Sequence, residues 1–453
     1  MPDAARTNTV LGLAADLAAG RTSSRELVEE ALGRIADPAG EGARTFVKIY
    51  ADQARAAADA QDRLRHAGYA ASPLAGLPVS IKDLFDVAGE VTLAASKALD
   101  DRPPAAADAP VVARLRAAGA VLIGRTNMTE FAFSGVGINP HFGTPGNPHD
   151  RGHIPGGSSS GAAVSVADGQ AVVGIGSDTG GSVRIPAALC GIAGFKPTKR
   201  RIPCDGAIPL STTLDSIGPL ANSIACCAVT DAVLAGEQPS APAPTPAEAM
   251  RLAVPRCYLV RDGVAPEVAS AFERACAALS RAGARLVDLM LPELDEIPAI
   301  NASGGFAPIE AYWWHKELLA RRGAEYDPRV RTRIERAAAM TAVEYIELVA
   351  ARADLIARLA PRTAGFDALL MPTVTMTAPP IAAFADDADY RHLNAMILRN
   401  PSAINFLDRC AATIPIQPPG TAPVGLTAVG EHGGDRHLLA VARGIENAVG
   451  GWD

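Results

Sequence analysis

Two segments rich in glycine and serine contain the residues with the clearest potential for chemistry. GGSSSG spans residues 156–161, and GSDTGGSVRIPA spans residues 176–187. A serine hydroxyl becomes a nucleophile when a neighbouring base takes its proton, and the N–H groups of a tightly curled loop can bind the oxyanion that then develops. Lys82, in PVSIKD, can be such a base only when it is neutral, and a lysine considered alone is usually a solvated surface residue.

Three interpretations explain the two Gly-Ser segments by themselves, without Lys82. Tight turns between core elements are the simplest explanation of Gly-Ser clusters. A phosphate-binding loop is disfavoured, because neither segment has GxGxxG or GxxxxGK[ST] spacing. Gly157, Ser159 and Gly161 match GxSxG, the nucleophile elbow of an α/β-hydrolase esterase. Against the elbow, residues 154–157 are too few and too rich in Gly and Pro to form the strand that it needs.

A fourth interpretation takes both loops together with Lys82. The combination of GGSSSG, DTGGS (residues 178–182) and the lysine of PVSIKD resembles the amidase signature family. Further segments that resemble this family are GRTNMTEFA (124–132), NPHFGTPGNP (139–148), CGIAGFKPT (190–198), DSIGPLA (215–221) and PVGLTAVGEHGGDRHLL (423–439). The resemblance is densest over residues 74–222 and is weak over residues 236–364.

The resemblance implies a Ser-Ser-Lys triad. Ser182 would be the nucleophile, Ser158 the bridging serine that follows a cis peptide bond from Gly157, and Lys82 the base. Lowering a lysine pKa from about 10.4 to about 7 costs about 4 to 5 kcal/mol of differential solvation, which burial must supply. The apolar residues of the segment 77–81 make that burial plausible.

The resemblance also implies an oxyanion hole and supporting residues. The oxyanion hole would consist of the N–H groups of Thr179, Gly180, Gly181 and Ser182. The residues expected to support the triad are Ser159, Asp178 and Arg184. For Arg184 two roles stay open: it ties one loop to another, or its planar fork binds a substrate carboxylate.

The function implied is that of an amidohydrolase. It would cleave a carboxamide of a small molecule through a seryl acyl-enzyme and release ammonia or an amine. Alternatives are the glutamine-hydrolysing A subunit of a tRNA-dependent amidotransferase, the GxSxG-type esterase and a catalytically silent binding protein. The intact triad positions argue against the last.

One turn departs from the family pattern. KPTKRR has Lys199 and Arg200 where the family commonly has an aromatic residue and a glycine. If that glycine has positive φ, Arg200 requires a rearranged turn. The two added cations would also favour an acidic substrate.

Composition and spacing exclude several classes of protein. The 453 residues carry 42 Lys and Arg against 49 Asp and Glu, a net charge of −7, with no long basic run, so no nucleic-acid partner is expected. No apolar stretch approaches 18 residues, so we expect no membrane span and a cytoplasmic location. The seven cysteines lack CxxC spacing, and His141, His149 and His153 lack further ligands, so no metal or cofactor is expected. Members of this family are often homodimers.

The elements around the motifs alternate between helix and strand. Ser23 and Glu26 form a capping box before a helix, residues 53–67 predict a second helix, and residues 77–81 a strand that ends at Lys82. Asp108 is expected to cap a helix that stops at Gly119, and Asp435 to cap a final helix. Tyr312, Trp313 and Trp314 would pack a helix or line a substrate wall.

This alternation predicts an α/β fold. Together with the resemblance, it implies a single large domain over residues 1–453, with a mixed, mostly parallel central sheet covered by helices on both faces. Within it we expect a catalytic core over about 74–222, a substrate-shaping region over about 236–364 and a C-terminal part over 365–453 that completes the fold.

Overall fold

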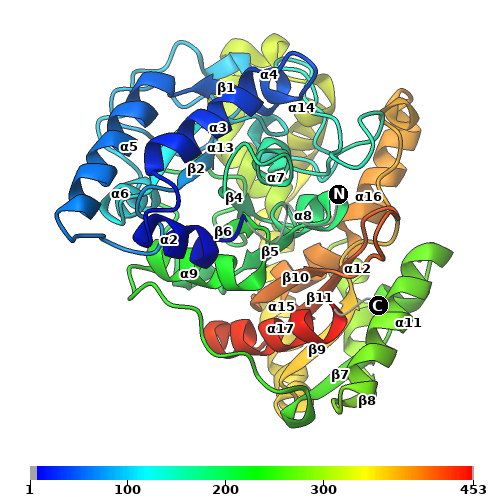
Figure 1. Cartoon of the computed structure of the whole chain (residues 1–453). Coiled ribbons are helices and arrows are strands. Elements are labelled where there is room, and N and C mark those ends of the chain that lie inside the picture. Colours follow the sequence, from blue (N-terminus) through cyan, green and yellow to red (C-terminus); the bar gives the residue numbers. More distant parts are fainter. Residues whose placement is uncertain (1–7, 451–453) are drawn as a thin grey trace.

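A single mixed sheet of eleven strands runs through the part of the chain that the computed structural model describes, residues 8–450 (Figure 1). The strand order is β1-β3-β2-β4-β6-β5-β10-β11-β9-β7-β8. The strands are β1 (Phe46–Ile49), β2 (Pro78–Lys82), β3 (Val121–Thr126), β4 (Val173–Asp178), β5 (Ala193–Lys196), β6 (Ser216–Ala221), β7 (Arg251–Arg256), β8 (Arg285–Met290), β9 (Ala368–Pro372), β10 (Ala411–Pro415) and β11 (Gly425–Val429).

Helices cover both faces of this sheet. They are α2 (Val10–Ala18), α3 (Ser24–Ala36), α4 (Gly42–Thr45), α5 (Ala51–His66), α6 (Pro110–Ala117), α7 (Ser160–Ala167), α8 (Arg184–Cys190), α9 (Ile224–Ala235), α10 (Tyr258–Arg261), α11 (Pro266–Arg281), α12 (Ile297–Ile300), α13 (Phe306–Arg322), α14 (Pro328–Glu335), α15 (Ala342–Thr363), α16 (Asp387–Phe406) and α17 (Asp435–Val449). α7 and α8 pack on β4, β5 and β10, while α9 and α17 pack on β5, β6 and β10 from the other side (Figure 1).

The α/β fold with a mixed sheet is confirmed, but parallel pairs are the minority. They form two blocks, β3-β2-β4 and β9-β7-β8, which give four parallel pairs among the described strands. The six other pairs, including all of those in the middle of the sheet, are antiparallel. Strands β10 and β11 follow each other directly, and a short connection reverses the chain, whereas parallel pairing needs a long crossover.

Most predicted elements form where the sequence places them. α3 begins with the Ser23–Glu26 capping box, and β2 ends at Lys82. Asp108 does not cap α6: Ala109 occupies that position, and Asp108 instead accepts a hydrogen bond from Ala88 N. Asp435 likewise does not cap α17 but is its first residue and accepts from the backbone N–H of Thr198. In both cases tertiary hydrogen bonds replace the local one.

None of the described helices is long and apolar enough to cross a membrane. The division of residues 1–453 into a catalytic core, a substrate-shaping region and a completing C-terminal part stays a prediction.

Candidate active site

The candidate site lies where two neighbouring parallel strands end. β2 pairs with β4 through Ile81 and Ile175, so Lys82 at the end of β2 lies beside Ser177 near the end of β4. Carboxyl ends of parallel strands open onto a crevice in α/β sheets. The two glycine-serine loops come to this same edge, because one precedes α7 and the other follows β4 directly.

Lys82 is enclosed completely and is held by hydroxyl groups. Its side chain has no exposed surface. Its Nζ atom donates to Ser158 Oγ at 2.7 Å and to Ser177 Oγ at 2.8 Å. Among the described residues no carboxylate lies within salt-bridge distance of it. A lysine in such surroundings loses hydration without gaining an ion pair.

Burial therefore changes the acid-base state of Lys82. Loss of solvation lowers its pKa to about 7, against the opposing effect of the Asp178 and Asp215 carboxylates farther away. A substantial fraction of this lysine is neutral at neutral pH, so it can accept a proton.

The first serine loop brings Ser158 to Lys82. The Gly157–Ser158 peptide bond is cis, as the resemblance implied. Ser158 O accepts from Thr129 N at 3.1 Å, which anchors the loop to the segment after β3. Ser159 N donates to Ser182 O at 3.3 Å, so the two serine loops are joined through their backbones.

The second serine loop curls around the Asp178 carboxylate. Oδ1 of Asp178 accepts from Gly181 N at 2.8 Å, and Oδ2 accepts from Val183 N at 3.2 Å. Gly181 has φ of +123°, and a Cβ there would lie 2.4 Å from Pro401 Cβ, so only glycine fits. The curl leaves Ser182 at the floor of a cavity, with 3% of its surface exposed.

Arg184 ties loops together, the first of the two roles considered for it. It is fully buried, and its Nε and Nη2 atoms donate to Asp178 at 3.0 and 2.9 Å. Nη2 also donates to Asn405 Oδ1 on α16. Burial alone would raise the pKa of Asp178, but the Arg184 guanidinium outweighs it and holds that pKa below the usual range. Arg184 lines neither cavity described below, so a substrate carboxylate does not reach it.

The larger cavity begins at Ser182 and has a volume of about 590 Å³. Thr179, Gly180 and Ser182 form its polar end. Its apolar wall comes from segments far apart in the sequence: Phe133 after β3, Leu214 before β6, Ile297 and Pro298 of α12, Phe306 of α13, and Leu398 and Phe406 of α16. The lining also includes two arginines, Arg333 and Arg399.

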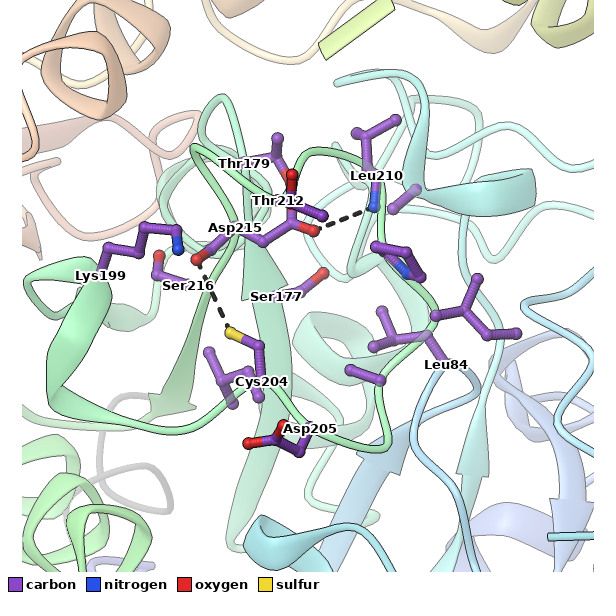
Figure 2. Close-up of a pocket in the computed structure, with 15 residues that line it drawn as sticks. Leu84, Ser177, Thr179, Lys199, Cys204, Asp205, Leu210, Thr212, Asp215 and Ser216 are labelled. Carbon is purple, nitrogen blue, oxygen red and sulfur yellow. Dashed lines mark hydrogen bonds between the residues drawn. The ribbon is translucent and has the colours of Figure 1, made fainter. Parts of the chain in front are cut away.

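A smaller cavity of about 240 Å³ lies on the other side of Thr179. Figure 2 shows Ser177, Lys199, Cys204 and Asp215 around it. Burial raises the pKa of the Asp215 carboxyl to about 6. Hydrogen bonds from Thr179 Oγ1 and from the amides of Ser211 and Leu210 act in the opposite direction but are outweighed. Ser177, which accepts from Lys82, lines this cavity, whereas Ser182 does not.

Comparison with known proteins identifies the family. A model of the Amidase family matches residues 26–439. The 2-amino-5-chloromuconic acid deaminase of Comamonas testosteroni is 37% identical over 406 residues, which cover 88% of this chain and 87% of that protein. The chain belongs to the amidase family. It is thereby an amidohydrolase, an enzyme that acts on carbon–nitrogen bonds of amides.

Two further similarities mark the range of this amidase family. The A subunit of the glutamyl-tRNA(Gln) amidotransferase of Roseiflexus sp. (strain RS-1) is 35% identical over 458 residues, covering 93% of this chain and 92% of that protein. The solved structure of a peptide amidase from Stenotrophomonas maltophilia has a TM-score of 0.80 at 29% identity and covers 97% of this chain and 96% of its own.

The nucleophile-elbow interpretation is wrong for this amidase. None of the described strands leads directly into Ser159, which occupies the position just before α7. Its hydroxyl is buried and donates to Ser177 O at 3.3 Å, so it faces the core rather than a cavity.

The unusual KPTKRR turn is accommodated without positive φ. Lys199–Arg201 form one turn of 3₁₀ helix, and Arg200 does not have positive φ. Lys199 lines the smaller cavity and not the larger one, so the expectation that this turn selects an acidic substrate at Ser182 is not supported by its position.

The loop histidines and the aromatic run have structural contacts. His141 Nε2 lies 2.9 Å from Glu130 Oε1, and His153 pairs with Asp150. Within residues 8–450 no group of three or more His, Cys, Asp or Glu side chains is arranged to hold a metal. Trp314 packs against the rings of Phe131 and His315. Trp313 is 62% exposed, so it neither packs in the core nor lines the larger cavity.

Sequence reasoning missed three residues of the site: Ser177, Asp215 and Arg333. Ser177 precedes DTGGS directly, and the alternation of side chains along β4 offered a signal, since Ser177 and Asp178 must face opposite sides. Asp215 lies in DSIGPLA, which the resemblance included without a role. For Arg333 no signal was present, because nothing in the sequence brings α14 to Ser182.

Proposed function

We propose that this amidohydrolase cleaves a carboxamide through an acyl-enzyme on Ser182, with Ser158 as proton relay and Lys82 as base. What supports this most directly is one contact: the Nζ atom of a fully buried lysine with lowered pKa lies 2.7 Å from Ser158 Oγ. No metal or organic cofactor takes part in the proposed steps.

In the acylation half, neutral Lys82 accepts the proton of Ser158, which in turn takes the proton of Ser182 as that oxygen attacks the amide carbonyl. A serine hydroxyl suits this relay because it donates and accepts at once. When the tetrahedral intermediate collapses, the proton returns through Ser158 to the leaving nitrogen, and ammonia or an amine departs.

The oxyanion would be bound by backbone N–H groups of residues 179–182. Among the described atoms, the amides of Gly180 and Ser182 donate to no other group, while the amide of Gly181 donates to Asp178. We therefore expect Gly180 and Ser182 to supply the principal donors, with Thr179 beside them and Gly181 holding the curl. One such donor typically contributes about 2.7 to 4 kcal/mol to transition-state binding.

In the deacylation half, water attacks the acyl carbonyl and gives its proton to the same relay. The carboxylic acid product leaves, and Ser182 recovers its proton from Ser158. Ser159, Asp178 and Arg184 act by holding the two loops in register and do not touch the reacting atoms.

Covalent labelling tests the assignment. A serine-directed fluorophosphonate should modify Ser182, and tryptic mass spectrometry should locate the adduct on the peptide that contains it. Ser182→Ala should abolish labelling, whereas Ser159→Ala should retain it. An adduct on Ser159, or none on a folded wild-type enzyme, would contradict the proposal.

A glutaminase role in a tRNA-dependent amidotransferase is the second candidate, because the amidotransferase protein is similar over 93% of this chain. The two functions differ in their need for a partner. The purified chain alone should release ammonia from simple amides; ammonia release from glutamine only with a copurifying partner protein would favour the amidotransferase.

We further propose that the enzyme works in the cytoplasm. Its seven cysteines are all unpaired, and five of them are buried, as is usual for a reducing compartment. A homodimer is also proposed, and light scattering on the purified chain tests it.

A further inference from the structure

The larger cavity is positively charged and has no compensating acid. Its lining includes Arg333 on α14 and Arg399 on α16, and none of its described lining residues is Asp or Glu. The rest of the wall is mainly apolar, so an ion that enters is removed from most of its water. Both arginines are partly buried and form no ion pair with the described residues, so a bound anion would supply the missing counter-ion.

The two arginines differ in the hydrogen-bond donors that they have left. All three nitrogens of Arg399 donate to the chain: Nε to Asn400 Oδ1, Nη1 to Asp262 O and Nη2 to Leu259 O. Arg333 makes one such bond, from Nη1 to Phe133 O at 2.7 Å. A guanidinium has five N–H donors, so most of those on Arg333 remain without an acceptor among the described residues.

Arg333 is also held in place. Its guanidinium carbon lies 4.4 Å from the centre of the Phe133 ring, and Phe133 itself lines the cavity. Neighbouring arginines on the same helix are neutralised, since Arg329 pairs with Asp387 and Arg331 with Glu335. The described residues place no carboxylate at salt-bridge distance from Arg333. Its planar fork is thus fixed and available for a bidentate partner.

We infer that the enzyme selects amides that carry a carboxylate, and that Arg333 binds this carboxylate while the amide lies at Ser182. This inference rests on the proposed function of Ser182. The apolar wall between the two ends would hold the hydrocarbon chain of the substrate. Arg399, each of whose three nitrogens already donates to the chain, contributes mainly positive potential.

Matched substrates test the inference. Succinamate carries a carboxylate, and 4-methylpentanamide is its neutral counterpart of the same shape; malonamate and glutaramate vary the spacing. We expect the wild-type enzyme to hydrolyse one of the carboxylated amides with higher kcat/KM than 4-methylpentanamide. Arg333→Met should lower kcat/KM for that amide by about 30- to 1000-fold, mainly through KM, and change the neutral amide by less than about threefold.

Arg331→Met is the matched control, because it removes an exposed arginine from the same helix; it should leave both values within about twofold. Arg333→Lys keeps the charge but loses the fork, and should fall between wild type and Arg333→Met. If Arg333→Met does not fold, protection replaces it: succinate should slow fluorophosphonate labelling of wild-type Ser182, while pentane-1,5-diol should not.

The failures are distinguishable. Equal or better hydrolysis of the neutral amide, or equal losses for both amides in Arg333→Met, overturns the inference while Ser182 labelling upholds the proposed function. A folded enzyme that labels at Ser182 but turns over no carboxylated amide overturns it as well. Absence of labelling at Ser182 overturns the proposed function, and the inference with it.

Discussion

The two ends of the larger cavity are built in opposite ways. At the serine end, three short segments supply nearly every group, and backbone geometry positions them: a curl around Asp178, a cis bond before Ser158 and a strand end at Lys82. At the arginine end, side chains from α12, α13, α14 and α16 meet without any local motif. Under the proposed function, chemistry depends on local backbone geometry and substrate choice on packing between distant segments, so changes at the two ends should have separable effects.

The largest effect is expected from Ser182→Ala at the serine end. Loss of the nucleophile should lower kcat by about 10⁴- to 10⁶-fold, because Ser182 Oγ is the atom proposed to form the acyl-enzyme. Ammonia release under saturating substrate measures it. Ser134→Ala, which changes another serine of the cavity wall that contacts Asn394 and not the residues 179–182, serves as control. Substantial activity in Ser182→Ala would remove this residue from the chemistry.

Lys82→Met tests whether burial makes this lysine a base. In the wild type, activity should rise with pH through about 7, because only the neutral amine accepts a proton and its pKa is lowered to about 7. The variant should lose about 10²- to 10⁴-fold at neutral pH. The loss should shrink at alkaline pH, where hydroxide partly replaces the base. A wild-type profile that is flat from about pH 5 to 9 would contradict this role.

Asp178→Asn should lower the stability of the folded protein as well as the rate of hydrolysis. The carboxylate pairs with buried Arg184 and accepts from the backbone of the curl, so its loss leaves a buried cation. We expect the free energy of unfolding to fall by about 3 to 5 kcal/mol, measured by urea denaturation. Asp16→Asn, which removes an exposed partner of Arg21, should have a much smaller effect.

Lys199→Met should have the smallest effect. Lys199 lines the smaller cavity and not the larger one, and Ser182 lines only the larger one. We expect kcat/KM for carboxylated and neutral amides to change by less than about threefold. A selective loss for carboxylated amides would instead assign the choice of an acidic substrate to the KPTKRR turn.

The sequence by itself determined the α/β class and most element positions, and its resemblance to the amidase signature family suggested the residues proposed for the serine end. Element positions could be predicted because capping boxes and turn glycines act over a few residues, where spacing and sterics are readable. The roles of the serines came from the resemblance and not from their spacing. The sequence also predicted a lowered pKa for Lys82, since an apolar strand implies that the lysine at its end is buried. Ser177 was missed although it is adjacent to a motif.

Only the tertiary structure decided how the sheet pairs, what Arg184 does and what surrounds the substrate. Whether neighbouring strands run parallel depends on the whole connection between them, and the partner of Arg184 includes Asn405, more than 200 residues away. Arg333 reaches the cavity because α14 packs beside the segment that contains Phe133. Such contacts form because apolar surface is buried across the whole molecule. This driving force is non-directional, so it leaves no local pattern in the sequence that would indicate which distant segments meet.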